Sequence, residues 1–449
     1  MKFIPNSSIK QEMLDEIRLK KIDDLYSDVP NKIKIQKLNL DNGLSQQETY
    51  RKLKNLSTEN VPASKILSFL GGGIKQHFVP PVVKAITSRS EFYTSYTPYQ
   101  AEASQGFLQA MFEYQSMIAE ITGMDVANCS LYDGFTALSE AALMSARITK
   151  KSKFLILANI FWEKKSILCN YAKGPNIDIV EVPYNINTGK IDLEILSRKL
   201  DNNTAGIYIE NPNFFGIFED SVSEVKKMCS EVGALLVVGI DPLSIGIMKS
   251  PGDYGADIVI GEGRSLGNQM DFGGSTLGIF ACKKEYLRQM PGRIIGLTKD
   301  NAGKRAFCMA LQTREQHIRR GRATSNICTN EGLCALAASS YLAWLGGTGL
   351  EKLSKKNFDM GKKLSDAVTS IDGFTKKFSG VHFNEFVINS EKPLDKINKK
   401  LLAKQIHGGL LLSPWYPELK NCFLLGITEM YNDEDIKKFV DGLMEVSNV

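Results

Sequence analysis

Hydrophobic and polar positions follow two different periods through the middle of the chain. Residues 105–122 place apolar side chains three, four and seven positions apart and end before Gly123, which predicts an amphipathic helix. Apolar runs of strand length follow, separated by segments of helical length. The predicted strands are 153–158, 177–182, 205–210, 234–240, 256–260 and 276–281, and the predicted helices between them include 192–200 and 221–233. This alternation predicts a mainly parallel sheet covered on both faces, with ligands at the carboxyl ends of its strands.

The two ends of the chain have other patterns. Residues 1–62 are rich in lysine and acidic residues, with scattered apolar positions, and predict an amino-terminal helical arm before a large α/β domain at 63–320. Residues 321–449 predict a smaller α+β domain. Its expected elements are helices at 331–344 and 347–364 and strands at 381–388 and 422–427.

Composition narrows the function classes. With 43% hydrophobic and 23% charged residues among 449, the chain has the make-up of a soluble globular protein. Its formal charge of +5 comes from dispersed lysines and arginines, so no nucleic-acid-binding surface is expected. The longest apolar stretch, 335–346, is too short and interrupted to cross a membrane, and no export signal is visible, so a cytoplasmic location is expected. The eight cysteines and four histidines are scattered, and no metal site is predicted.

Asp241 stands directly after the predicted strand 234–240. An acid at this place pairs with the pyridinium nitrogen in pyridoxal-phosphate enzymes, and a turn cap is an equally good interpretation from this residue alone. The lysine that would form the Schiff base should follow the next strand, but no lysine lies between Lys249 and Lys283, and Arg264 stands in the expected region. Arginine stays protonated and does not form an imine at neutral pH, so the chain is not expected to catalyse alone.

Several longer motifs point to one enzyme family. They are 91–105 (EFYTSYTPYQAEASQ), 123–128 (GMDVAN), 132–134 (YDG), 210–216 (ENPNFFG), 322–329 (RATSNICT) and 415–419 (WYPEL). From residue 63 onward the chain resembles the glycine cleavage system P-protein, or glycine dehydrogenase (decarboxylating). Some members are one long chain and others are two unlike halves, and this chain is similar to the first half, subunit 1 or alpha.

The resemblance implies a pyridoxal-phosphate-dependent transferase fold of type I. It also implies a reaction in which glycine is decarboxylated with pyridoxal phosphate and its aminomethyl group passes to the lipoyl arm of the H-protein. On this interpretation the cofactor is bound covalently by a second, beta subunit, whose active site this chain completes. The implied assembly is a heterotetramer of two alpha and two beta subunits.

The resemblance also suggests site residues. Tyr96, Thr97 and Tyr99 are expected to reach the partner's active site, and the residues expected at substrate or at the subunit interface are Tyr93, Gln100, Glu102 and Ser104. A tyrosine cluster is also a common packing feature, and Glu102 and Ser104 serve equally well as the charge and cap of the helix that follows. Asp241, Arg264 and Asn213 are expected to be vestigial cofactor positions, and for Asn213 a structural turn is an equal alternative.

The chain departs from the family pattern at some of these places. Arg264 replaces the glutamine usual in subunit 1, Gly321-Arg322 replaces an acid–lysine pair, and Phe135 replaces a small residue. Two alternatives therefore stay open: a non-catalytic protein that stabilises or regulates a partner on the same fold, and an independent pyridoxal-phosphate aminotransferase or lyase. The altered residues Arg264 and Arg322 slightly favour the non-catalytic protein, whereas the retained tyrosines argue against it. The missing lysine argues against an independent aminotransferase or lyase.

Overall fold

The computed structural model describes residues 7–35, 37–93 and 96–447 and forms two compact units, Met1–Pro62 and Ala63–Val449. The first unit contains helices α1 (Lys10–Glu16) and α2 (Gln46–Ser57). A capping box starts α2, because Ser45 Oγ accepts from the amide of Glu48 and the Glu48 carboxylate accepts from the amide of Ser45. Within this unit Leu14 is the one apolar side chain that the described residues bury.

The second unit is built on a seven-stranded sheet. Its strands, in order across the sheet, are β2 (Val126–Ala127), β8 (Gly278–Cys282), β7 (Ile258–Glu262), β6 (Leu235–Ile240), β5 (Thr204–Glu210), β3 (Lys153–Leu157) and β4 (Asp178–Val182). The strands from β7 to β4 pair in parallel, while β8 is antiparallel to both of its neighbours. The predicted mainly parallel sheet is confirmed.

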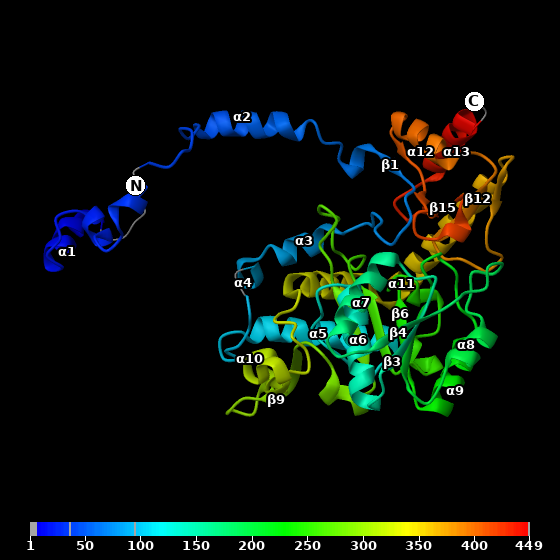
Figure 1. The fold of residues 1–449 in the computed structure, drawn as a ribbon, viewed down its shortest axis with the longest axis horizontal. Coiled ribbons are helices and arrows are strands. Elements are labelled where there is room, and N and C mark those ends of the chain that lie inside the picture. Colours follow the sequence, from blue (N-terminus) through cyan, green and yellow to red (C-terminus); the bar gives the residue numbers. More distant parts are fainter. Residues whose placement is uncertain (1–6, 36, 94–95, 448–449) are drawn as a thin grey trace. The chain divides into compact units, whose positions relative to one another are not determined.

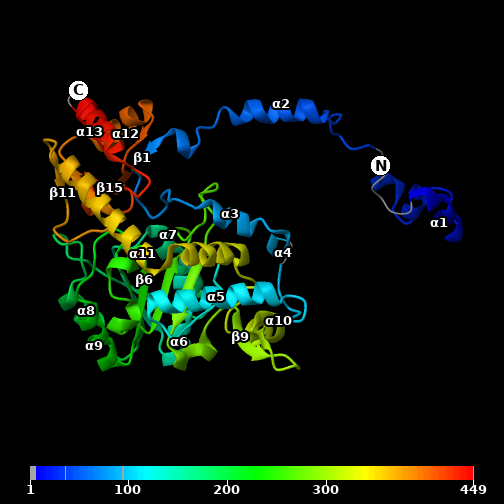
Figure 2. The same cartoon turned by 180° about the vertical axis from the view of Figure 1, so that it is seen from behind.

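Helices cover both faces of this sheet (Figures 1 and 2). One face carries α3 (Pro81–Thr87), α5 (Gln105–Thr122), α8 (Leu193–Lys199), α9 (Val222–Val232) and the first half of α11 (Gly332–Thr369), and the other carries α6 (Gly134–Thr149) and α7 (Trp162–Lys173). Successive side chains of a strand point to opposite faces, so β5 buries Ile207 and Ile209 in the first core and Tyr208 in the second.

A smaller antiparallel sheet follows towards the carboxyl terminus. Its strands, in order, are β11 (Phe374–Lys376), β12 (Glu385–Ser390), β15 (Cys422–Gly426) and β14 (Leu410–Leu411), and α12 (Leu394–Ala403), α13 (Asp433–Ser447) and the second half of α11 pack on it. The remaining elements are β1 (Leu67–Ser68), paired with β13 (Ile406–His407), the hairpin β9 (Ile294–Lys299) and β10 (Arg305–Ala310), and the short helices α4 (Ser90–Tyr93) and α10 (Gln316–Arg319).

Helix α11 agrees with the two helices predicted at 331–344 and 347–364. Its 38 residues form two helical halves that meet at a kink at Gly346, whose φ of 63° and ψ of 175° are not helical. By length and composition alone α11 is long and apolar enough to cross a membrane, whereas the apolar stretch 335–346 was expected to be too short and interrupted. Its first half, however, buries Ala335, Ala338 and Tyr341 in the first core of the sheet, as a helix inside a globular unit does.

A glycine-rich segment, residues 71–78, connects the two sheets; we call it the glycine loop. Gly72 and Gly73 have φ values of 108° and 91°, which favour glycine. Their amides donate to Glu385 Oε1 at 2.6 and 3.0 Å, and Lys75 Nζ lies 3.0 Å from Glu385 Oε2. The buried ion pair therefore holds the glycine loop on strand β12.

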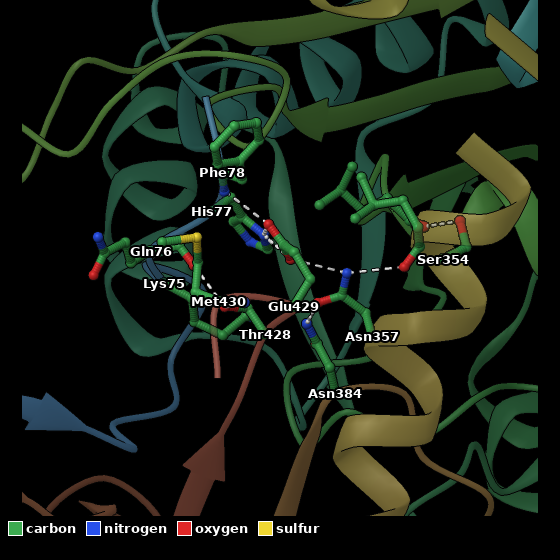
Figure 3. Close-up of polar contacts among 12 residues, drawn as sticks. Lys75, Gln76, His77, Phe78, Ser354, Asn357, Asn384, Thr428, Glu429 and Met430 are labelled. Carbon is green, nitrogen blue, oxygen red and sulfur yellow. Dashed lines mark hydrogen bonds and ion pairs between the residues drawn. The ribbon is translucent and has the colours of Figure 1, made fainter. Parts of the chain in front are cut away.

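Glu429, after β15, holds the other end of the glycine loop (Figure 3). Its carboxylate accepts from the amide of Phe78 at 2.8 Å and from Asn357 Nδ2 of α11 at 3.0 Å, and it lies 3.0 Å from His77 Nδ1. Burial alone would raise the pKa of Glu429, but the hydrogen bond and charge of His77 and the Phe78 amide outweigh it, so the net shift of the pKa is downward. This carboxylate therefore joins the glycine loop, α11 and the small sheet.

Replacing Glu429 by glutamine is expected to lower the free energy of unfolding at neutral pH by about 1.5–3 kcal/mol, because charge-assisted bonds to a buried group become neutral ones. A carboxylate whose pKa is depressed in the folded state stabilises the protein above its unfolded pKa, and that contribution is lost as the pH falls. The difference between wild type and Glu429→Gln should thus shrink on acidification, which urea unfolding at several pH values measures. Glu445→Gln, in an exposed pair with Lys404, is the control and should change little. Equal stability of Glu429→Gln and wild type would contradict this account.

Candidate active site

A cavity of about 380 Å³ opens at the carboxyl edge of the large sheet. Its wall comes from the ends of β5, β6 and β7, the start of α6, the glycine loop and strand β12. The volume and the position are those of a small-ligand site in an open α/β sheet. The cavity contains the predicted positions Asp241, Arg264 and Asn213, so the structure brings these three residues together.

Asp241 and Arg264 are held in different ways. Asp241 Oδ1 accepts from the amide of Leu243 at 3.0 Å, so the carboxylate caps its own turn. Arg264 is 3% exposed, and its Nη2 donates to the carbonyl oxygen of Lys75 at 2.8 Å. Burial lowers the pKa of Arg264, and the charges of Glu262 and Asp241 oppose that shift. Arg264 therefore binds the glycine loop through the carbonyl oxygen of Lys75.

The amino terminus of α6 faces the same cavity, where its free amides form the kind of site that binds a phosphate. In this chain, however, these amides donate hydrogen bonds to protein carboxylates. Asp133 Oδ1 accepts from the amides of Phe135 and Thr136 at 2.8 and 2.7 Å, and Glu262 Oε2 accepts from the amide of Gly134 at 3.1 Å. Glu262 Oε1 also accepts from two further amides, those of Arg264 and Leu277. A phosphate would have to displace both acids.

Two lysines line the cavity, although neither follows β7. Lys75 is paired with Glu385, and Lys164, near the start of α7, is paired with Glu210 at the end of β5. The Lys164 ammonium also lies 5.5 Å from the centre of the Phe135 ring, which packs on Phe161. A Schiff base at either lysine would leave a largely buried carboxylate without its partner, at a cost of several kcal/mol by order of magnitude.

The side chain of Asn213 makes all of its hydrogen bonds within the protein. Its Nδ2 donates to the carbonyl oxygen of Gly189 and to Glu219 Oε1, and its Oδ1 accepts from the amides of Phe215 and Ile217. Two donors and two acceptor positions are all that an asparagine side chain offers. Burial raises the pKa of Glu219 to about 7, opposed by the Ile191 amide and Asn213. In this chain Asn213 builds a turn.

The residues of the cavity do not fit pyridoxal phosphate. Six acidic side chains line it against three basic ones: Asp133, Glu163, Glu210, Asp241, Glu262 and Glu385 against Lys75, Lys164 and Arg264. The phosphate-binding amides are occupied, the lysine after β7 is missing, and Phe135 stands beside the helix start. Asp241 alone matches the cofactor's needs.

The tyrosine segment, residues 91–105, lies elsewhere. None of its described residues lines the cavity, and Thr94 and Ser95 fall outside the described residues. The side chains of Tyr93, Tyr96 and Tyr99 are 68%, 80% and 51% exposed. Three exposed tyrosines within seven residues form an apolar surface with polar tips, which is typical of a contact with another molecule.

The other candidate residues of the tyrosine segment differ in their exposure and hydrogen bonding. Gln100 and Glu102 are exposed, and Thr97 Oγ1 is buried without a hydrogen-bond partner among the described residues. Ser104 stands at the N-cap position of α5, but its side chain makes no capping bond, so the interpretation of Ser104 as a cap is wrong. Its backbone, at φ −123° and ψ 23°, is outside the extended region that a capping residue adopts.

Sequence reasoning missed Glu210, Glu262, Lys164 and Lys75. Glu210 and Glu262 end β5 and β7, so their place at the carboxyl edge of a parallel sheet was a usable signal. The two lysines come from a helix and a loop, and no spacing in the sequence places them opposite their carboxylates. Arg322, another departure from the family pattern, is exposed next to the segment 323–330.

The fold defines the class of protein: this is the architecture of pyridoxal-phosphate-dependent enzymes of fold type I. A glutamate decarboxylase from Lactobacillus brevis has the same fold, with a TM-score of 0.68 and 12% identity over 94% of this chain and 97% of that one. The sequence model of the glycine cleavage system P-protein matches residues 1–443, and the chain belongs to that family.

Two similar proteins cover almost the whole chain. A probable glycine dehydrogenase (decarboxylating) subunit 1 from Thermococcus onnurineus is 47% identical over 450 residues, which are 99% of each chain. A crystal structure of glycine decarboxylase (P-protein) of the glycine cleavage system, in inhibitor-bound form, has a TM-score of 0.91 and 37% identity, covering 99% of this chain and 100% of that one.

The isolated chain is expected not to hold pyridoxal phosphate covalently, even when a lysine is placed at position 264. After incubation with the cofactor and borohydride reduction, intact-mass measurement should find no cofactor adduct on wild type. Arg264→Lys should also stay unmodified, because Asp133 and Glu262 still occupy the α6 amides. A stoichiometric adduct on Lys75 or Lys164 of the wild type, or on the new lysine, would show that the cavity accepts the cofactor.

Proposed function

We propose that this chain is subunit 1 of a two-subunit glycine dehydrogenase (decarboxylating), and that it completes the active site of a lysine-bearing second subunit. In this proposal the second subunit holds pyridoxal phosphate covalently, and the aminomethyl group of glycine passes to the lipoyl arm of the H-protein. A cytoplasmic heterotetramer of two alpha and two beta subunits remains part of the prediction. The observation that carries the proposal is the state of the chain's own cavity, in which protein carboxylates accept the hydrogen bonds of the α6 amides that a phosphate would need.

The tyrosine segment supports a contribution to another chain. Its exposed rings are separate from the chain's own cavity, and hydroxyl groups at the edge of a partner's site would bind substrate and exclude water there. Of the three tyrosines, Tyr99 is the one with a ring contact and a cation contact among the described residues. Its ring lies 5.7 Å from that of His317 and 5.7 Å from the guanidinium carbon of Arg293.

The amino-terminal unit supports a heteromeric assembly. Among the described residues, fifteen of the thirty-two large hydrophobic side chains that are exposed belong to Met1–Pro62. On α2, Tyr50, Leu53 and Leu56 repeat at spacings of three and are 65%, 60% and 50% exposed. A segment with so little core of its own gains apolar burial only against another surface.

The two alternatives fare differently. An independent aminotransferase or lyase needs the Schiff-base lysine and a free phosphate site, and the cavity offers neither. A non-catalytic interaction protein on the same fold shares the blocked cavity with our proposal. It differs in one respect, which is that the tyrosine hydroxyls would have no effect on the rate of an assembled enzyme.

Assembly with the second subunit is expected to bury more than about 2,000 Å², the size of an obligate interface. Removing residues 1–62 should leave the far-UV circular dichroism per residue of the body largely intact, because its five apolar cores use residues from Leu67 onward. The truncated chain should bind the second subunit at least tenfold more weakly by titration, roughly the loss of 1.4 kcal/mol.

A point-variant pair refines this test. Leu53→Glu with Leu56→Glu should weaken assembly as well, whereas the control Lys52→Gln with Lys54→Gln, on the same helix, should not. Unchanged affinity after truncation would mean that the arm has another role. A full-length chain that ignores the second subunit altogether would overturn the proposed function.

In the assembled enzyme, Tyr96→Phe and Tyr99→Phe are each expected to reduce glycine decarboxylation by about 10²-fold, the usual effect of losing one hydroxyl that acts in the transition state. Complex formation and cofactor absorbance should be unchanged, because a phenyl ring keeps the packing. Tyr286→Phe, outside the tyrosine segment, is the matched control. If both variants kept full activity, the interaction-protein alternative would replace our proposal.

A further inference from the structure

Arg293 occupies an unusual place for an arginine. It precedes strand β9 and is 4% exposed. Its Nη1 donates to Thr329 Oγ1 and Asn330 Oδ1, and its Nη2 donates to the carbonyl oxygen of Cys328, each at 3.0 Å. A planar guanidinium with several fixed donors suits this set of acceptors, which an ammonium group cannot satisfy in the same geometry. Arg293 therefore binds residues 328–330 as one unit.

The unit that Arg293 binds is itself anchored to the body. The amide of Cys328 donates to Tyr132 Oη at 3.1 Å, and Asn330 Nδ2 donates to the carbonyl oxygen of Cys129 at 3.2 Å. The amide of Cys129 in turn donates to the carbonyl oxygen of Arg293 at 2.9 Å. These bonds fix residues 328–330 on the body, and through them the position of the guanidinium.

The free face of the guanidinium meets Tyr99. Its central carbon lies 5.7 Å from the centre of the ring, within the range of a cation–π contact. On another side His317 meets the same ring edge to face at 5.7 Å, and Glu315 Oε2 lies 3.6 Å from His317 Nδ1. Among the described residues, Tyr93 and Tyr96 have no ring or cation contact of this kind. Tyr99 is thus positioned by a buried cation, while half of its side chain stays exposed.

We propose that Arg293 is a positioning residue that fixes Tyr99 for its work at the partner's active site, and that it couples the tyrosine segment to residues 328–330. This inference rests on the proposed function, because it gives Tyr99 a catalytic task. Arg293 itself is buried and acts through the ring. Its contribution is to reduce the number of orientations among which the Tyr99 side chain must be ordered before the reaction.

A double-mutant cycle tests the coupling in the full-length chain assembled with wild-type second subunit. Arg293→Lys keeps a charge but loses the fork of bonds, and it should lower kcat about fivefold to tenfold, the effect of a weakened cation–π contact. In the Tyr99→Leu background the same substitution should change kcat less than about twofold, because the residue through which it acts is gone. Arg305→Lys is the matched control, since Arg305 lies 5.8 Å from the ring of Phe307 in the β9–β10 hairpin.

The outcomes separate this inference from the proposed function. Equal fold losses from Arg293→Lys in both backgrounds, or no loss in either, would overturn the positioning role while leaving Tyr99 catalytic. Full activity of Tyr99→Leu would overturn this inference, because Tyr99 would have no catalytic task, and the proposed function would fall with it only if Tyr96→Phe also kept full activity. If Arg293→Lys fails to fold, judged by its thermal midpoint, Thr329→Val takes its place in the cycle. That variant removes one acceptor of Arg293 and should show the same dependence on Tyr99.

Discussion

Two carboxylates at the start of α6 set what this chain is able to do. Asp133 and Glu262 take the first three amides of the helix, and Glu262 also binds the amides of Arg264 and Leu277, so one buried acid joins β7, α6 and β8. Burial raises the pKa of Glu262, and these amides oppose that shift. A helix amino terminus is a ready site for a phosphate, and here its amides are part of the chain's own hydrogen bonding. In the proposed function, the chemistry of the family is completed on another chain, to which this chain contributes exposed residues.

Other charged groups of the cavity are likewise bound to groups of the protein itself. Lys164 pairs with Glu210, Lys75 with Glu385, and Arg264 with the carbonyl oxygen of Lys75, so the cations of the wall are used inside the protein. Through Glu385 the glycine loop is bound to the small sheet. Through Glu429 it is bound to α11 (Figure 3). The result is a body whose two sheets are held together by the chain's own ion pairs and hydrogen bonds.

The sequence predicted the fold well where one face of an element is apolar. Helix α5 was predicted at its observed bounds, because its apolar stripe is regular and Gly123 adopts the left-handed conformation that ends helices. Helix α6 was missed, since it is buried around most of its surface and carries no clear polar face. In the site, the rule for strand ends predicted Asp241 at the carboxyl edge of the sheet and Arg264 after the next strand, and the structure shows that both line one cavity. The bond between Glu429 and Phe78 joins residues 351 positions apart, and no local pattern contains it. The role of Arg293 is equally invisible in the sequence, because it depends on where residues 328–330 and Tyr99 meet.

The central claim is that this chain completes a site without holding the cofactor. The most direct measurement is the amount of pyridoxal phosphate bound per chain in the purified complex of this chain with its second subunit, by native mass spectrometry with dissociation into separate subunits. The account predicts one cofactor for each pair of unlike chains, all of it on the second subunit. Cofactor retained on this chain, or two cofactors for each pair, would contradict it.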